Sequence, residues 1–161
     1  MERVQHPFQP IVDEECHILI LGSFPSVKSR EDGFYYAHPQ NRFWRMLAAV
    51  YEEETPTDIP AKQKFLLRHH IALWDVIASC EIEGSADASV KEAVPVEIEQ
   101  IIKVAKIAKV LCNGKLAAKL YHQYLEPCVC IKAISLPSSS PANAAFSIEK
   151  LVETWRAALL Q

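Results

Sequence analysis

Four short apolar runs, rich in isoleucine, leucine and valine, constrain the fold of this chain more than any other feature. They lie at residues 18–21, 71–74, 109–112 and 129–134. Their apolar residues are continuous rather than alternating, which is typical of strands buried on both faces. Between and after them, apolar residues recur at helical spacing. Strands that alternate with helices predict an α/β fold built around a parallel sheet that is covered on both sides.

Five segments carry the helical spacing. Pro60 suits the first turn of one of them, because the N–H that proline lacks would have no partner there. No internal repeat, low-complexity tract or linker divides the 161 residues, so we expect a single domain over residues 1–161. The helices are expected at residues 42–51, 60–68, 98–105, 116–125 and 148–159.

Charge and apolar content exclude several classes of protein. The net charge of −3 argues against a protein that coats nucleic acid non-specifically. Local positive charge is nevertheless present at Lys28, Arg30, Arg42 and Arg45. No apolar run is long enough to span a bilayer, and the first residues do not resemble a signal peptide. We therefore expect a cytoplasmic monomer that does not bind a membrane.

The cysteine and histidine patterns argue against disulfide and metal sites. The five cysteines are odd in number and scattered, which disfavours a disulfide framework. Cys128 and Cys130 form a C-x-C in a strand-like stretch, and we expect them to be buried apolar thiols rather than ligands of a metal or an iron–sulfur cluster. The six histidines show no ligand spacing. We expect no metal and no cofactor.

An unusual segment follows each predicted strand. In an open parallel sheet, ligands bind beyond the carboxyl ends of the strands, where these segments would meet. In the first segment, Gly22 and Pro25 would hold a stiff turn. One or two rings of Phe34, Tyr35 and Tyr36 should be core, and a ring left at the rim would stack on a planar ligand. We predict one site built from residues 22–44, 75–79, 113–115 and 136–144.

Polar residues in these segments each have a structural and a functional interpretation. Asn41 precedes the first predicted helix, and it either caps that helix or positions a water by accepting a hydrogen bond from it. Asn113 has the same ambiguity, and its amide suits the edge of a nucleobase. Asp75 either caps a turn or points its carboxylate into the site. The segment 138–143 is either a polar turn or a set of neutral donors to a phosphate backbone.

Three motifs together resemble the uracil-DNA glycosylase superfamily, with its hypoxanthine-DNA glycosylase branch as the best match. They are Gly22-Ser-Phe-Pro-Ser, Tyr36-Ala-His-Pro-Gln-Asn-Arg-Phe-Trp and Leu136-Pro-Ser-Ser-Ser-Pro-Ala-Asn-Ala. The resemblance implies a three-layer α/β/α sandwich with a short, mostly parallel four-stranded central sheet. It also implies an enzyme that flips a deaminated base out of DNA and hydrolyses its N-glycosidic bond, leaving an abasic site, without a metal or cofactor.

The resemblance also suggests roles for single residues. Most relatives place a catalytic Asp or Asn where this chain has Phe24, and many place a histidine where it has Leu136, so Asn41 is the expected catalytic, water-positioning residue. Tyr36 matches the ring that stacks on the base. The expected base-binding set is Phe24, Tyr36, Asp75 and Asn113. The expected DNA contacts are Ser26, Lys28, Arg42, Ser138, Ser139, Ser140 and Asn143.

Hypoxanthine is the expected substrate base, with uracil second. Hypoxanthine can leave with a hydrogen bond or proton at N7, whereas uracil leaves as an anion that Leu136 cannot stabilise. Two other classes stay open. A damaged-base binding module would bind such DNA and leave no alkali-labile site. A nucleoside hydrolase would turn over free inosine and would not need the segment 138–143.

Overall fold

The central sheet of the protein has four parallel strands. The computed structural model describes residues 2–82 and 91–161. The strands are β2 (Ile18–Gly22), β3 (Ile71–Asp75), β6 (Lys109–Asn113) and β7 (Ala133–Leu136), in the order β3-β2-β6-β7. Every residue of β2 and β3 is buried, as predicted for strands covered on both faces. The chain runs from β2 to β3 and then crosses to β6 on the other side of β2, so the topology switches between β2 and β6.

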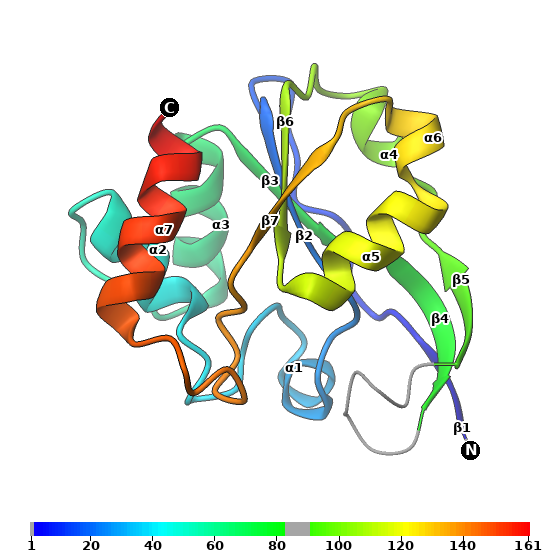
Figure 1. Cartoon of the computed structure of the whole chain (residues 1–161), viewed down its shortest axis with the longest axis horizontal. Helices are drawn as coiled ribbons and strands as arrows, with labels where there is room; N and C mark the ends of the chain where they lie inside the picture. Colours follow the sequence, from blue (N-terminus) through cyan, green and yellow to red (C-terminus); the bar gives the residue numbers. More distant parts are fainter. Residues whose placement is uncertain (1, 83–90) are drawn as a thin grey trace.

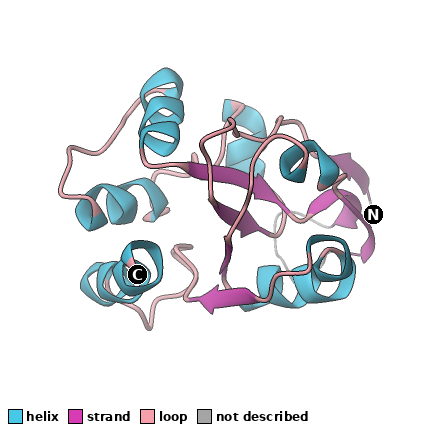
Figure 2. Ribbon diagram, turned by 90° about the horizontal axis from the view of Figure 1, so that it is seen from above, coloured by secondary structure: helices cyan, strands magenta, loops and turns pink. Residues whose placement is uncertain are grey.

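Helices cover both faces of this sheet. In Figure 1, α2 (Phe43–Val50), α3 (Ile59–Arg68) and α7 (Ile148–Leu160) lie on one side. The other side carries α4 (Glu99–Ile102), α5 (Lys115–Tyr124) and α6 (Glu126–Val129). Figure 2 shows the same layers from above. The predicted α/β fold with three layers is confirmed, and the five predicted helices are present, although α4 is shorter than expected.

A second, antiparallel sheet was not predicted. It contains β1 (Glu2–Gln5), β4 (Ile77–Ile82) and β5 (Lys91–Pro95), in the order β1-β4-β5. Strand β4 begins two residues after β3 ends, so the segment 75–79, predicted to lie beyond a strand, is itself mostly strand rather than loop. The backbone N–H of His6 donates to the carbonyl of Ala78 at 2.7 Å. This pairing brings the first residues of the chain to the carboxyl end of β3.

The prediction of a strand over residues 129–134 is wrong at its start. Val129 ends α6, which has Pro127 in its first turn, and Cys130 leaves the helix in the left-handed conformation with φ 62°. Cys128 and Cys130 are exposed, so the expectation that both are buried is also wrong. Cys16, Cys80 and Cys112 are buried, and none of the five cysteines forms a disulfide. Burial raises the pKa of Cys112 to about 12, which keeps its thiol protonated.

One short helix in the first loop was also not predicted. Helix α1 (Val27–Asp32) begins at Ser26, whose hydroxyl accepts from the N–H of Ser29 at 3.2 Å. Gly33, with φ 77°, ends it in the left-handed region that glycine adopts without strain. Together with the chain that follows, α1 lies below the carboxyl end of the central sheet in Figure 1.

Candidate active site

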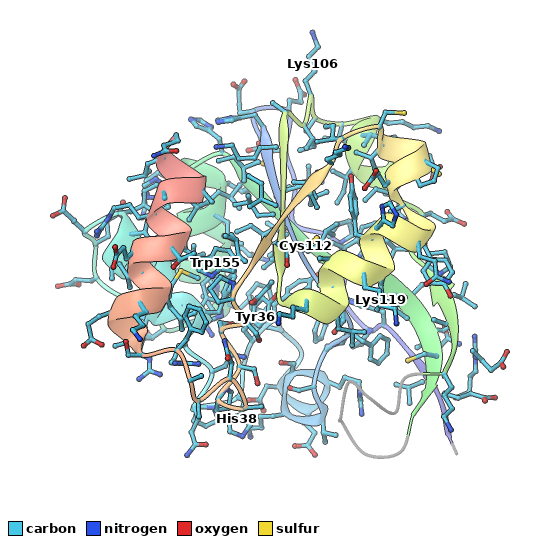
Figure 3. The ribbon with its side chains drawn as sticks, in the orientation of Figure 1. Tyr36, His38, Lys106, Cys112, Lys119 and Trp155 are labelled. Carbon is cyan, nitrogen blue, oxygen red and sulfur yellow. The ribbon has the colours of Figure 1, made fainter. Side chains whose placement is uncertain are left out.

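A cavity of about 550 Å³ opens at the carboxyl end of the central sheet, where the predicted segments converge. Figure 3 shows Tyr36 close to the end of the sheet and His38 farther out on the same rim. Three predicted site residues do not line this cavity, namely Lys28, Arg42 and Asn143. The predicted residues that line it are Phe24, Ser26, Tyr36, Asn41, Asp75, Asn113, Ser138, Ser139 and Ser140.

The three consecutive rings of Phe34, Tyr35 and Tyr36, in the segment that follows β2, differ in how far they are buried. Phe34 and Tyr35 are buried, as expected for one or two of them, although Tyr35 also forms part of the cavity wall; Tyr36 is only partly buried and lines the cavity. Tyr36 has φ 53°, a left-handed conformation that is uncommon for a bulky residue. One face of its ring stacks on Phe43, with centroids 4.1 Å apart and 25° between the planes. The indole N–H of Trp44 donates to the carbonyl of Tyr35 at 3.1 Å and anchors the loop from below.

Two asparagines and a serine form a chain of hydrogen bonds whose direction is fixed. The N–H of Ser139 donates to Oδ1 of Asn113 at 2.9 Å, so the amide nitrogen of Asn113 must be the atom that donates to Oγ of Ser139 at 3.0 Å. Oγ of Ser139 in turn donates to Oδ1 of Asn41 at 2.8 Å. Ser139 is fully buried between the two amides. It therefore connects Asn113 and Asn41, a place that disfavours the predicted phosphate contact.

Asn41 has a structural role close to the helix cap that the sequence allowed: Arg42 is the N-cap residue of α2, and the oxygen of Asn41 accepts from the first N–H of the helix. Oδ1 accepts from the N–H of Phe43 at 3.0 Å as well as from Ser139 at 2.8 Å. A backbone N–H can only donate, so the amide nitrogen Nδ2 must point away from it. A carbonyl oxygen has two lone pairs, and both are used here. Nδ2 is therefore the part of Asn41 left to act in the cavity.

A buried, hydrogen-bonded pair of side chains, His6 and Asp75, lies at the inner wall of the cavity. Nε2 of His6 lies 2.8 Å from Oδ2 of Asp75, and each side chain is 4% exposed. Asp75 lines the cavity, and the ring of Phe24 meets the ring of His6 edge to face, with centroids 5.9 Å apart. Burial, together with the charge of Asp75, raises the pKa of Tyr35 far above its usual value, and its hydroxyl donates to Gln9 O at 2.8 Å. Sequence reasoning missed His6, since its partner lies 69 residues away along the chain.

Gly22 is required by close approach rather than by turn geometry. A Cβ atom at this position would lie 2.4 Å from Oδ1 of Asp75 and 2.7 Å from the hydroxyl oxygen of Tyr36. Gly22 pairs with Asp75 in the register of β2 and β3. The N–H of Val76 donates to the carbonyl of Gly22 at 2.8 Å, which fixes this corner of the sheet.

The guanidinium of Arg42 fixes the backbone of the segment 138–143, the serine-rich segment, by binding its carbonyl groups. Nη2 donates to the carbonyls of Ser140 and Asn143 at 2.8 and 3.1 Å, and Nη1 donates to the carbonyl of Phe146. The backbone N–H of Arg42 also donates to the carbonyl of Ser139 at 3.1 Å. These contacts disfavour the predicted role of Arg42 as a phosphate ligand and make it the organiser of the segment.

Within the serine-rich segment, the side chains form turns that still leave donors available. The hydroxyl oxygens of Ser138 and Ser140 accept from the N–H groups of Ser140 and Ala142, each at 3.1 Å. Because these hydroxyls act as acceptors, their own hydrogens can still donate to a ligand in the cavity. The amide of Asn143 donates to the carbonyl of Ser138 at 3.0 Å. On the other side of the cavity, Lys28 pairs with Asp32 at 3.3 Å on the surface of α1.

Across residues 2–82 and 91–161, no group of three or more His, Cys, Asp and Glu side chains is arranged to hold a metal ion. In the same part of the chain, no helix combines the length and the apolar character needed to cross a bilayer.

Comparisons with known proteins give consistent results. The sequence model of the Uracil DNA glycosylase superfamily matches residues 9–159. The hypoxanthine DNA glycosylase of Methanosarcina barkeri is 37% identical over 113 residues, which cover 67% of this chain and 70% of the relative. The protein of the same name from Methanosarcina acetivorans is 33% identical over 156 residues, 96% of this chain and 97% of the relative. The solution NMR structure of a candidate uracil DNA glycosylase from Methanosarcina acetivorans superposes with a TM-score of 0.81 at 32% identity, covering 96% of both chains.

Proposed function

The chain belongs to the uracil DNA glycosylase superfamily, and from this premise we propose that it removes hypoxanthine, and less readily uracil, from DNA. It is a DNA glycosylase of deaminated bases, an enzyme that hydrolyses N-glycosyl bonds. The preference for hypoxanthine is supported by the two relatives that bear that base in their names. We also propose that it acts as a monomer in the cytoplasm, on damaged DNA.

The fixed hydrogen-bond direction at Asn41 is the observation that carries the proposed chemistry. Cleavage of a glycosidic bond passes through an oxocarbenium-like sugar and needs a placed water and help for the departing base. The oxygen of Asn41 is saturated, which leaves the two hydrogens of Nδ2 for the cavity. We therefore revise the expected role of Asn41 from acceptor to donor. Nδ2 would hold the oxygen of the water or a ring nitrogen of the departing base.

The remaining cavity residues suit an extruded base. Flipping costs a few kcal/mol and is cheapest at mispaired or damaged bases. Tyr36 would stack on the base, with Phe43 supporting its ring from the other face. Asn113 has a second amide hydrogen beyond the one that it gives to Ser139, so it can donate to the edge of the base. The hydroxyls of Ser138 and Ser140 would donate to the phosphates on either side of the extruded nucleotide.

The presence of Leu136 supports the proposed preference for hypoxanthine over uracil. Its side chain is buried at the end of β7, 5% exposed. An apolar side chain there offers no donor to an anion, and uracil leaves as one. Hypoxanthine can instead accept a hydrogen bond at N7 as it departs, which Asn41 is placed to give. The chemistry of this site therefore favours a purine that leaves with such a bond.

Two variants of Asn41 test its role against a purely structural one. Asn41→Asp keeps an oxygen for the N–H of Phe43 and for Ser139 but removes the donors. If Nδ2 acts as a donor, this variant loses about 10²–10³-fold in cleavage of a deoxyinosine duplex, as Asn41→Ala does. If the oxygen positions water instead, Asn41→Asp retains activity while Asn41→Ala does not. Full activity in both variants would return Asn41 to capping alone.

One gel and a separate assay on free inosine distinguish the proposed activity from the other classes. Labelled duplexes carrying hypoxanthine, uracil or xanthine are incubated with the protein and then treated with alkali. Strand breaks at hypoxanthine, and fewer at uracil, are expected. Binding without alkali-labile sites would indicate a binding module, and release of hypoxanthine from free inosine would indicate a nucleoside hydrolase.

A further inference from the structure

The buried pair of His6 and Asp75 has no part in the chemistry assigned to Asn41. Both side chains are 4% exposed, yet Asp75 lines the cavity and its Oδ1 lies beside Gly22, another lining residue. Burial of a charged group is costly unless it is paired and hydrogen-bonded. A carboxylate held at the wall of a cavity that suits planar bases is therefore a candidate acceptor for a polar group of the bound base.

The tautomer of His6 follows from its contacts. The backbone N–H of Phe8 donates to Nδ1 of His6 at 3.1 Å, so Nδ1 carries no hydrogen. In a neutral imidazole the hydrogen then lies on Nε2, which donates to Oδ2 of Asp75 at 2.8 Å. Phe8, Phe24 and Tyr35 pack around the ring, with centroids 5.3, 5.9 and 5.9 Å away. Both ring nitrogens of His6 therefore have partners within the protein, and the contact that His6 makes at the cavity wall is its hydrogen bond to Asp75.

We infer that His6 is a positioning residue that keeps Asp75 as a fixed hydrogen-bond acceptor for the ring N–H of an extruded base. The inference rests on the proposed function, since it names how that site recognises its substrates. With Oδ2 bound to His6, the carboxylate is oriented with Oδ1 toward the Gly22 corner of the cavity. The second sheet delivers His6, because its backbone pairs with Ala78 of β4.

A fixed hydrogen-bond acceptor distinguishes a deaminated base from the base that it derives from. Adenine presents N1, and cytosine N3, as a lone pair, which an acceptor repels. Deamination turns both ring nitrogens into N–H donors, in hypoxanthine and in uracil. A buried acceptor therefore accepts the two damaged bases and rejects their parents, because an unpaired polar group in a buried site is costly. Guanine already carries N1–H and thymine N3–H, so this contact does not exclude either of them.

The test is a thermodynamic cycle in which the imidazole of His6 and the N1–H of the base are removed separately and together. Duplexes with deoxyinosine or 1-methyldeoxyinosine, which lacks N1–H, are compared with wild-type protein, His6→Leu and His6→Gln. His6→Leu should lose about 10–100-fold in kcat/KM on deoxyinosine, the worth of one hydrogen bond to a charged group, and little on the methylated base. The ratio of kcat/KM on deoxyinosine to kcat/KM on 1-methyldeoxyinosine is then lower in His6→Leu than in the wild type by the same factor. His6→Gln, whose amide can donate to Asp75, should restore most of it.

Other outcomes separate this inference from the proposed function. A merely structural role for His6 would lower both rates equally and leave the preference unchanged, which would overturn the inference. Should His6→Leu fail to fold, equal rates of wild-type protein on the two duplexes would overturn it as well. Equilibrium binding is measured in parallel. Wild-type protein that binds deoxyinosine more tightly than its methylated form without cleaving it would refute the proposed activity and support this recognition.

Discussion

Replacing Gly22 with alanine should disable the site while leaving the fold intact. The added methyl group would stand 2.4 Å from Oδ1 of Asp75 and 2.7 Å from the hydroxyl oxygen of Tyr36, whereas ordinary contact begins at 3.4 Å. Asp75 must then retreat by about 1 Å, and a misplacement of that size costs roughly 100-fold in rate. Neither group can yield freely, because His6 holds Asp75 and Phe43 supports the ring of Tyr36.

Stability should change little in this variant. Alanine within a strand gains roughly 0.5–1 kcal/mol over glycine, which offsets part of the strain. The melting temperature should therefore shift by no more than a few degrees. The assay is single-turnover cleavage of a deoxyinosine duplex beside thermal unfolding of the same preparation. Wild-type kcat/KM in Gly22→Ala would refute the argument that this corner sets the geometry of the site.

Gly33→Ala is the matched control. Gly33 has φ 77°, which costs an alanine roughly 1–2 kcal/mol. Its added methyl group meets nothing within 4 Å, and Gly33 does not line the cavity. This variant should lose several degrees of melting temperature and keep its activity, the reverse of Gly22→Ala. A parallel loss of activity in both variants would show that general destabilisation explains the first result.

Three further predictions concern binding and stability. Arg42→Gln should weaken DNA binding without changing the slope of log Kobs against log salt concentration, because the guanidinium holds carbonyls; loss of a phosphate contact would reduce that slope by about 0.9. Tyr36→Ala should cost about 1–3 kcal/mol in binding a hypoxanthine duplex, measured by titration, and Tyr36→Phe should retain the stacking. Burial acts to raise the pKa of Glu53, but hydrogen bonds from Arg68 and His69 outweigh it and hold the pKa below its ordinary 4.5. The stability from Glu53 is then present above pH 4.5 and lost as pH falls through the lowered pKa, so Glu53→Gln should flatten the acid limb of unfolding free energy against pH. An acid limb as steep as in the wild type would contradict this.

The parts of the site that the sequence could predict are those set by parallel-sheet geometry. Continuous apolar runs located β2, β3 and β6, and the carboxyl ends of parallel strands meet at one edge. Asp75 and Asn113 end the neighbours of β2 on either side, so their convergence followed from strand order alone. The start of β7 was misplaced because Val129, Cys130 and Ile131 have strand-forming side chains, while Pro127 locally favours a helix start.

The remaining features depend on contacts between distant residues, which local patterns do not record. His6 meets Asp75 only because β1 pairs with β4. The link from Asn113 to Asn41 passes through Ser139, whose hydroxyl in the sequence looked like one donor among three. Arg42 looked like a phosphate ligand because its charge is visible in the sequence, whereas the carbonyls that it binds carry no sequence signal.

The carboxylate missing from the first motif has a counterpart one strand away. Phe24 occupies the position after β2 where most relatives are expected to carry an acidic or amide side chain, and its ring packs against His6. Asp75 ends β3 directly beside Gly22 in the register, so a carboxylate still stands at this corner of the sheet. Because His6 donates to Oδ2, the carboxylate of Asp75 is held in one orientation, with Oδ1 beside Gly22. This geometry supports the proposed division of roles, in which the carboxylate would recognise the base and the amide of Asn41 would take part in the chemistry.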